Sequence, residues 1–186
     1  MKSALTWLPA AAIVIVAPAM IAPAYAGQYA TVDEAAKRAF PDATAFKESV
    51  FQLSADQTSA VALATGLPAK PALWRSLIAM KADEILGVLV LDGVIGKFEL
   101  IDYAVGIGAD GKIRNVEILA YRESHGYEVR LPAWRKQFVG KNKADKLRVS
   151  EDIASISGAT MSATHITDGV RRIVAVIEQM KVAGKF

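Results

Sequence analysis

The sequence contains no cysteine, and this absence excludes several kinds of protein at once. Without thiols the chain cannot form disulfides, so its fold must depend on its hydrophobic core. Iron–sulfur clusters held by cysteine and covalently attached c-type haem also need thiols. The two histidines, His125 and His165, leave little for a metal site. A role in electron transfer would therefore require an organic cofactor.

A large excess of charge of one sign is also missing. The chain has 22 Lys and Arg against 19 Asp and Glu, a formal net charge of +3, which is too small to indicate nucleic-acid binding. The exception is the segment 130–148, where one acid accompanies seven cations: Arg130, Arg135, Lys136, Lys141, Lys143, Lys146 and Arg148. It could dock an acidic redox partner. The favoured interpretation is a solvated face whose acids lie elsewhere on the surface.

The N-terminus has the pattern of an export signal. Lys2 precedes the apolar run 4–21, and Ala24-Tyr25-Ala26 is an A-x-A cleavage site before Gly27. The sequence thus predicts a signal peptide at residues 1–26 and a periplasmic or other extracytoplasmic location. A retained membrane anchor is the alternative, although three prolines make this run a poor spanning helix (Pro9, Pro18 and Pro23).

The remaining residues, 27–186, predict one α+β domain, a twisted antiparallel sheet flanked by helices. Two capping boxes, Thr31–Glu34 and Ser54–Gln57, begin helices that end at Phe40 and near Gly66. Strands are predicted at 46–53, 73–80, 84–91, 98–108, 112–123 and 147–153, and the second and third of these are apolar, β-branched runs. Turns are expected at Asp92-Gly93 and, more strongly, at Asp110-Gly111. Helices are expected around 134–138, ending at Gly140, and from Ser162 or Thr164 to near Met180.

The stretch 155–162, Ser-Ile-Ser-Gly-Ala-Thr-Met-Ser, is a small, hydroxyl-rich loop that runs into the last predicted helix. Free N–H groups and the positive end of a helix dipole suit a phosphate at such a place. Gly158 allows close backbone approach, Ser157 and Ser162 can donate hydrogen bonds, and the hydroxyl of Thr160 could be esterified. The plainer interpretation is a turn before an ordinary helix, capped by Ser162 or Thr164.

Ser-Gly-Ala-Thr at 157–160 resembles the attachment site of the FMN-binding domain family, whose members include flavoprotein subunits of membrane electron-transfer complexes. Three further segments resemble the family in the expected order, 103–113, 121–127 and 137–141, and the resemblance is strongest over 98–182. Four ordered matches are far more specific than one. The family's acid six residues before the attachment threonine is Ala154 here, with Asp152 as the nearest acid, and Ser162 stands where a threonine often follows.

The resemblance implies FMN bound covalently to Thr160 by a phosphoester, with Ser157, Gly158, Ala159 and Ser162 around the phosphate. A separate flavin transferase would make the bond with FAD as donor. The isoalloxazine ring would neighbour the loop 123–127, formed by Glu123, Ser124, His125, Gly126 and Tyr127. Tyr127 or His125 could pack on the ring. Trp74 and Trp134 are expected to be core or rim aromatics rather than stacking partners, with Trp134 the better stacking candidate of the two. His165 is expected to be a solvated or capping residue.

The predicted function is electron transfer by an exported flavoprotein. No Ser-His-Asp order or paired-carboxylate pattern stands out, so an electron carrier is favoured over a turnover enzyme. Its expected partner is a redox protein or a membrane electron-transfer complex. Two alternatives stay open. One is a non-redox periplasmic module that binds a phosphorylated or anionic ligand. The other is an accessory component of such a complex, anchored by an uncleaved N-terminus.

Overall fold

The computed structural model describes residues 27–68, 70 and 73–185. The predicted signal peptide, 1–26, lies outside these residues. The element order is β1 (Gly27–Gln28), α1 (Val32–Ala39), β2 (Ala45–Gln52), α2 (Ala55–Thr65), β3 (Leu73–Lys81), β4 (Glu84–Ile95), β5 (Leu100–Gly108) and β6 (Ile113–Tyr121). It continues with the short helices η1 (Tyr127–Arg130), α3 (Pro132–Arg135) and η2 (Lys136–Phe138), and closes with α4 (Thr160–Val182).

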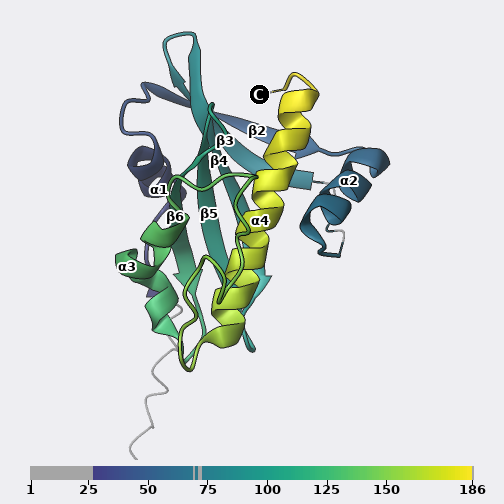
Figure 1. The fold of residues 1–186 in the computed structure, drawn as a ribbon. Helices are drawn as coiled ribbons and strands as arrows, with labels where there is room; N and C mark the ends of the chain where they lie inside the picture. The colour runs from purple at the N-terminus through teal and green to yellow at the C-terminus, as the bar shows by residue number, and fades with distance from the viewer. Residues whose placement is uncertain (1–26, 69, 71–72, 186) are drawn as a thin grey trace, which may run out of the picture.

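One antiparallel sheet organises the chain. Its six strands run in the order β1-β6-β5-β4-β3-β2, so every strand from β2 to β6 pairs with its neighbour in sequence. Helix α4 lies across one face of the sheet with α2 beside it, and α1 covers the other face (Figure 1). The predicted α+β class with helices flanking an antiparallel sheet is confirmed.

Two apolar layers hold these elements together. The larger lies between α4 and the sheet and includes Tyr103, Val105 and Ile173, all fully buried. The smaller lies under α1, where Ala36 packs near Leu89. Among the residues that the structure describes, no helix is long and apolar enough to cross a membrane.

The local signals for helices and for one hairpin are confirmed. Thr31 and Ser54 each cap a helix in a complete capping box, and Gly66 ends α2 in the left-handed conformation. The Asp110-Gly111 turn joins β5 to β6, with Gly111 at φ 82°.

Several elements differ from the prediction. Asp92 and Gly93 do not turn the chain but lie inside β4, paired with Tyr103 and Asp102 of β5. Residues 147–153 form no strand, because only a single bridge links Val149 to Ile153. The C-terminal helix begins at Thr160, before Ser162 and Thr164. Strand β1, which pairs with β6, was not predicted.

Candidate functional site

Thr160 is the first residue of α4, and it lies at the surface. The preceding Gly158 has φ +80°, a conformation that favours glycine, and a Cβ there would meet nothing within 4 Å. Ala159 is the N-cap residue, and no side chain caps the first turn of α4. The first N–H groups of a helix have no partner within the helix. An exposed hydroxyl thus adjoins uncapped helical N–H groups and open space.

The predicted loop 123–127 packs directly against this helix start. A Cβ on Gly126, at φ +80°, would come within 2.5 Å of the Cβ of Ala159 and 2.8 Å of the Tyr121 hydroxyl. That hydroxyl donates to the carbonyl of His125 at 2.5 Å. Only glycine fits at position 126. Because it has no side chain, the 123–127 loop can contact Ala159, more than thirty residues later in the sequence.

A hollow of about 560 Å³ opens between these segments. Its lining is Lys97, Phe98, Glu123, Ser124, His125, Gly158, Ala159, Thr160, Met161 and Ser162. The volume is in the range of small-molecule sites, about 300–1,000 Å³. Six of the nine predicted site residues line it. Ser157 lies in the exposed turn before it, and Gly126 lies behind it against Ala159.

Glu123 fixes the turn between β4 and β5 rather than standing free. Its Oε1 accepts the N–H of Phe98 at 2.7 Å and of Glu99 at 3.0 Å. Partial burial alone would raise the pKa of Glu123, but the N–H groups of Glu99, Phe98 and Lys97 outweigh it and lower that pKa. The carboxylate is therefore the form that the fold favours.

The Glu123 contacts predict a pH-dependent contribution to stability. Because its folded pKa is lowered, the contribution is present above the unfolded pKa and is lost as pH falls through the folded value. The carboxylate is largely solvated, so we expect only about 0.5 kcal/mol at neutral pH. In urea unfolding, Glu123→Gln should lose this amount at pH 7 and match the wild type at acidic pH. A pH-independent difference would contradict the assignment.

Tyr127 lies outside the hollow. It is 55% exposed and begins η1, where its ring lies 5.6 Å from the guanidinium of Arg130. Its predicted contact with a flavin stays a prediction. Ser124 lines the hollow, and its hydroxyl lies 2.8 Å from Nδ1 of His125.

The other aromatic and histidine candidates are structural. Trp134 is buried, lies edge-on to Phe138 and donates through Nε1 to the carbonyl of Ala154 at 2.9 Å. Trp74 is also buried in the core. Nδ1 of His165 lies 2.6 Å from the carbonyl oxygen of Ile95, so this side chain joins α4 to the end of β4.

The segment that leads to Thr160 is tied down by its backbone. The N–H of Ala154 donates to Oε1 of Gln137 at 2.8 Å, which links the 137–141 segment to the approach of Thr160. Asp152 does not stand in for an acid at position 154. Its carboxylate accepts the N–H of Leu147 and of Arg148 and pairs with Lys141 at 3.0 Å.

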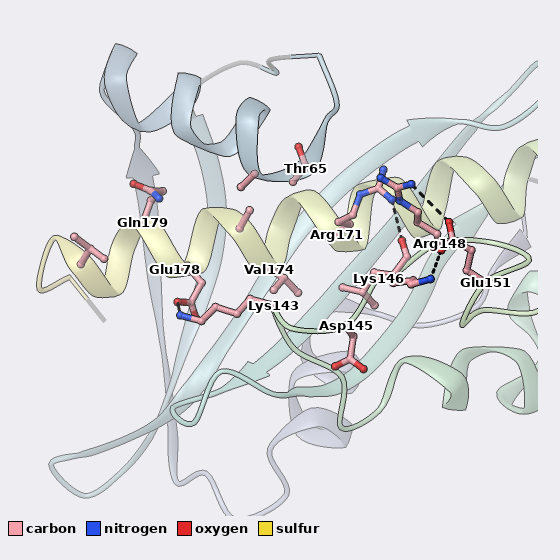
Figure 2. A pocket seen from close by; sticks show the side chains of 14 residues that line it. Thr65, Lys143, Asp145, Lys146, Arg148, Glu151, Arg171, Val174, Glu178 and Gln179 are labelled. Atoms are coloured by element: carbon pink, nitrogen blue, oxygen red, sulfur yellow. Dashed lines mark hydrogen bonds and ion pairs between the residues drawn. The ribbon is translucent and has the colours of Figure 1, made fainter.

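A second, larger hollow of about 790 Å³ lies between α2, α4 and the basic segment (Figure 2). There Lys146 and Arg148 reach Glu151 at 2.8 and 3.6 Å, and Lys143 pairs with Glu178 at 2.6 Å. The favoured interpretation of the basic segment, charges matched by acids elsewhere, agrees with these pairs. Thr160 does not line this second hollow. The candidate site is therefore the hollow of about 560 Å³, which Thr160 does line.

The residues that line this hollow lie in a segment that resembles known proteins. Residues 96–175 match the model of the FMN-binding domain. This segment belongs to the FMN-binding domain family. The match contains all nine predicted site residues and extends from Gly96 at the β4–β5 turn into α4.

Two relatives of this FMN-binding domain are informative. One component of the Na⁺-translocating ferredoxin:NAD⁺ oxidoreductase complex of Acetobacterium woodii is 26% identical over 130 residues, 64% of this chain and 63% of that protein. The chain thus aligns with less than two thirds of its relative. The crystal structure of Shewanella oneidensis NqrC superposes with a TM-score of 0.50 at 15% identity, over 75% of this chain and 85% of that one. The second likeness concerns the fold alone.

The site's own residues fit FMN. A phosphate suits the uncapped start of a 23-residue helix, whose dipole contributes about 0.3–1 kcal/mol. Gly158 leaves the approach open. The hollow also offers an apolar wall, since Phe98 is 73% exposed and Met161 45% exposed. Lys97, Phe98 and Met161 were not among the predicted site residues. For Phe98 the reason is that the predicted strand 98–108 includes it, whereas β5 begins at Leu100.

Proposed function

We propose that this protein carries FMN in a phosphoester bond to Thr160 and transfers electrons outside the cytoplasm. The observation that carries the proposal is the position of Thr160. Its hydroxyl is exposed at the uncapped start of α4 and lines a ligand-sized hollow in an FMN-binding domain.

The attachment step needs FAD and a separate flavin transferase. The oxygen of the Thr160 hydroxyl forms a bond to the phosphorus of the FMN half of FAD. The bond from that phosphorus to the bridging oxygen breaks, and AMP leaves with the oxygen. The hydroxyl proton passes to solvent or to a base of the transferase. No oxidation or reduction occurs, and the protein gains the mass of FMN minus one water.

The residues around Thr160 have separate tasks in this proposal. The first-turn N–H groups of α4 bind the phosphate, which carries one negative charge as a diester. Gly158 leaves their approach unobstructed. Gly126 and Tyr121 hold the 123–127 loop against Ala159 and so keep the hollow in shape.

Electron transfer is supported by the relative that matches in sequence, which is part of an oxidoreductase complex. Bound flavin exchanges electrons singly or in pairs, so it can join two-electron donors to one-electron acceptors. By analogy, the partner is a redox protein or a membrane electron-transfer complex. Export is proposed from the signal-like residues 1–26.

The test uses the full chain, expressed with a flavin transferase in a host that exports it. We expect the mature protein to begin at Gly27 and to be yellow. Its visible absorption should bleach on stoichiometric reduction and return on oxidation. A colourless exported protein would favour the non-redox binding module. A yellow protein that stays in the membrane with residues 1–26 attached would favour the anchored accessory component.

A further inference from the structure

The β4–β5 turn holds a large aromatic side chain in solvent. Phe98 is 73% exposed, although a phenyl ring is ordinarily buried in a fold of this size. Two apolar residues beside the turn are also exposed, Ile95 at 55% and Leu100 at 39%, and they pair with each other across β4 and β5. Phe98 is the one of the three that lines the hollow containing Thr160.

This turn is held in place by contacts with two other parts of the chain. Oε1 of Glu123 accepts the N–H of Phe98 and of Glu99. At Gly96 a Cβ would come within 2.9 Å of the Ser162 hydroxyl oxygen, so the turn also packs on α4. Nδ1 of His165 lies 2.6 Å from the carbonyl oxygen of Ile95. Contacts with both the 123–127 loop and α4 therefore fix the backbone that carries the exposed ring.

Two further side chains complete this wall of the hollow. Met161 directly follows Thr160, is 45% exposed and lines the same space. Lys97 lines it as well, with its ammonium 4.9 Å from the centre of the Phe98 ring. Lys97 is the one Lys or Arg among the lining residues. A phenyl ring, a thioether and a cation thus share the space beside the attachment hydroxyl.

We propose that Phe98 and Met161 form the apolar platform for the isoalloxazine ring of FMN, and that Lys97 supplies the charge that favours its reduced, anionic form. Flat aromatic and soft sulfur surfaces suit a large planar ring. A cation beside the ring raises the reduction potential because it stabilises the added negative charge. This inference rests on the proposed attachment at Thr160, and it assigns the ring to the β4–β5 turn in addition to the 123–127 loop.

The platform is tested by iodide quenching of flavin fluorescence in the flavinylated protein. Phe98→Ala should raise the quenching constant several-fold, toward that of free FMN, since it uncovers the ring. Phe98→Leu should restore most of the protection. Leu63→Ala, which removes a side chain 87% exposed on α2, should leave the constant unchanged.

Lys97 is tested by the midpoint potential of the bound flavin. Lys97→Gln should lower the potential, and the difference should shrink as ionic strength rises. The control is Lys112→Gln in the β5–β6 turn, away from the hollow, which should not shift the potential. A structural role for Lys97 would not produce a salt-dependent shift.

The outcomes separate this inference from the proposed function. Intact mass first establishes the flavin load of each variant. If Phe98→Ala is fully flavinylated and shows wild-type quenching, the platform is overturned while attachment at Thr160 stands. If the wild type acquires no flavin, both proposals fall. If Phe98→Ala alone loads poorly, Met161→Ala and Lys97→Gln decide the matter, because wild-type quenching in the first and a wild-type potential in the second would refute the proposal.

Discussion

Replacing Thr160 with alanine is expected to remove covalent flavin completely. The hydroxyl oxygen of Thr160 is the atom that would bond to phosphorus, and no neighbouring hydroxyl occupies an equivalent place. Ser162 is buried inside the first turn of α4, and Ser157 lies in the turn before Gly158. Because Thr160 is exposed, the Thr160→Ala protein should fold with stability within about 0.5 kcal/mol of the wild type. Denaturing gels viewed for flavin fluorescence, with urea unfolding of the same samples, measure both effects.

Two variants make this result specific. Thr160→Ser keeps a hydroxyl at the same position and should retain part or all of the flavin. Thr164→Ala removes a half-exposed hydroxyl one turn later in α4 and should carry the full load. Flavin that survives on the denatured Thr160→Ala protein would show that another residue is the attachment site.

Gly169→Ala should have the largest effect on stability. Gly169 lies in the middle of α4 where the helix crosses β5, and a Cβ there would overlap the hydroxyl of Tyr103 and lie 2.9 Å from its Cζ. Tyr103 cannot swing away, because it is fully buried and donates to Oδ2 of Asp92 at 2.6 Å. Asp92 is itself paired with Lys70 at 2.8 Å. We expect a loss of about 3 kcal/mol in urea unfolding, at the upper end of overpacking effects.

A double mutant separates this steric cause from a general effect on the helix. Tyr103→Phe alone should cost about 1 kcal/mol, since it removes one buried hydrogen bond. Combined with Gly169→Ala it also removes the clashing oxygen, so the double mutant should be more stable than the sum of the single losses by about 1 kcal/mol or more. Strict additivity would contradict the steric account. Because α4 also presents Thr160, Gly169→Ala should reduce the flavin load as well.

Elements that depend on residues close together in the sequence were predicted well. Thr31 with Glu34, and Ser54 with Gln57, satisfy the first N–H groups of their helices within four residues, so no distant contact is needed. The Asp110-Gly111 turn is equally local. Ser-Gly-Ala-Thr is followed by a helix as expected, although α4 begins at Thr160 and not at Ser162 or Thr164.

The elements that were not predicted depend on contacts between residues far apart in the sequence. Asp92-Gly93 has a turn composition, yet Lys70 and Tyr103 satisfy the Asp92 carboxylate and β4 continues to Ile95. The actual turn follows Gly96, and it is fixed by Glu123 from beyond β6. In the segment 147–153, Asp152 accepts nearby backbone N–H groups, and Leu147 and Ser150 take positive φ, which prevents a strand. Strand β1 exists only through its pairing with β6.

The same distinction applies to the site. The sequence predicted Gly158, Thr160 and the 123–127 loop from motifs that are local in the chain. It did not predict Phe98, because an exposed ring at the hollow depends on where the β4–β5 turn falls, and that turn depends on Glu123. Lys97-Phe98-Glu99 alternates charged and apolar residues as a half-buried strand does, so the local pattern gave no signal that Phe98 lies in a turn.

The most direct measurement is tandem mass spectrometry of the peptide that spans residues 149–171, taken from the flavinylated full chain. The account predicts that fragments containing Thr160 carry the mass of FMN minus one water. Fragments that end at Ala159 or begin at Met161 should be unmodified. A peptide without added mass, or one modified at Ser157 or Ser162, would contradict the assignment of Thr160 as the flavin attachment residue.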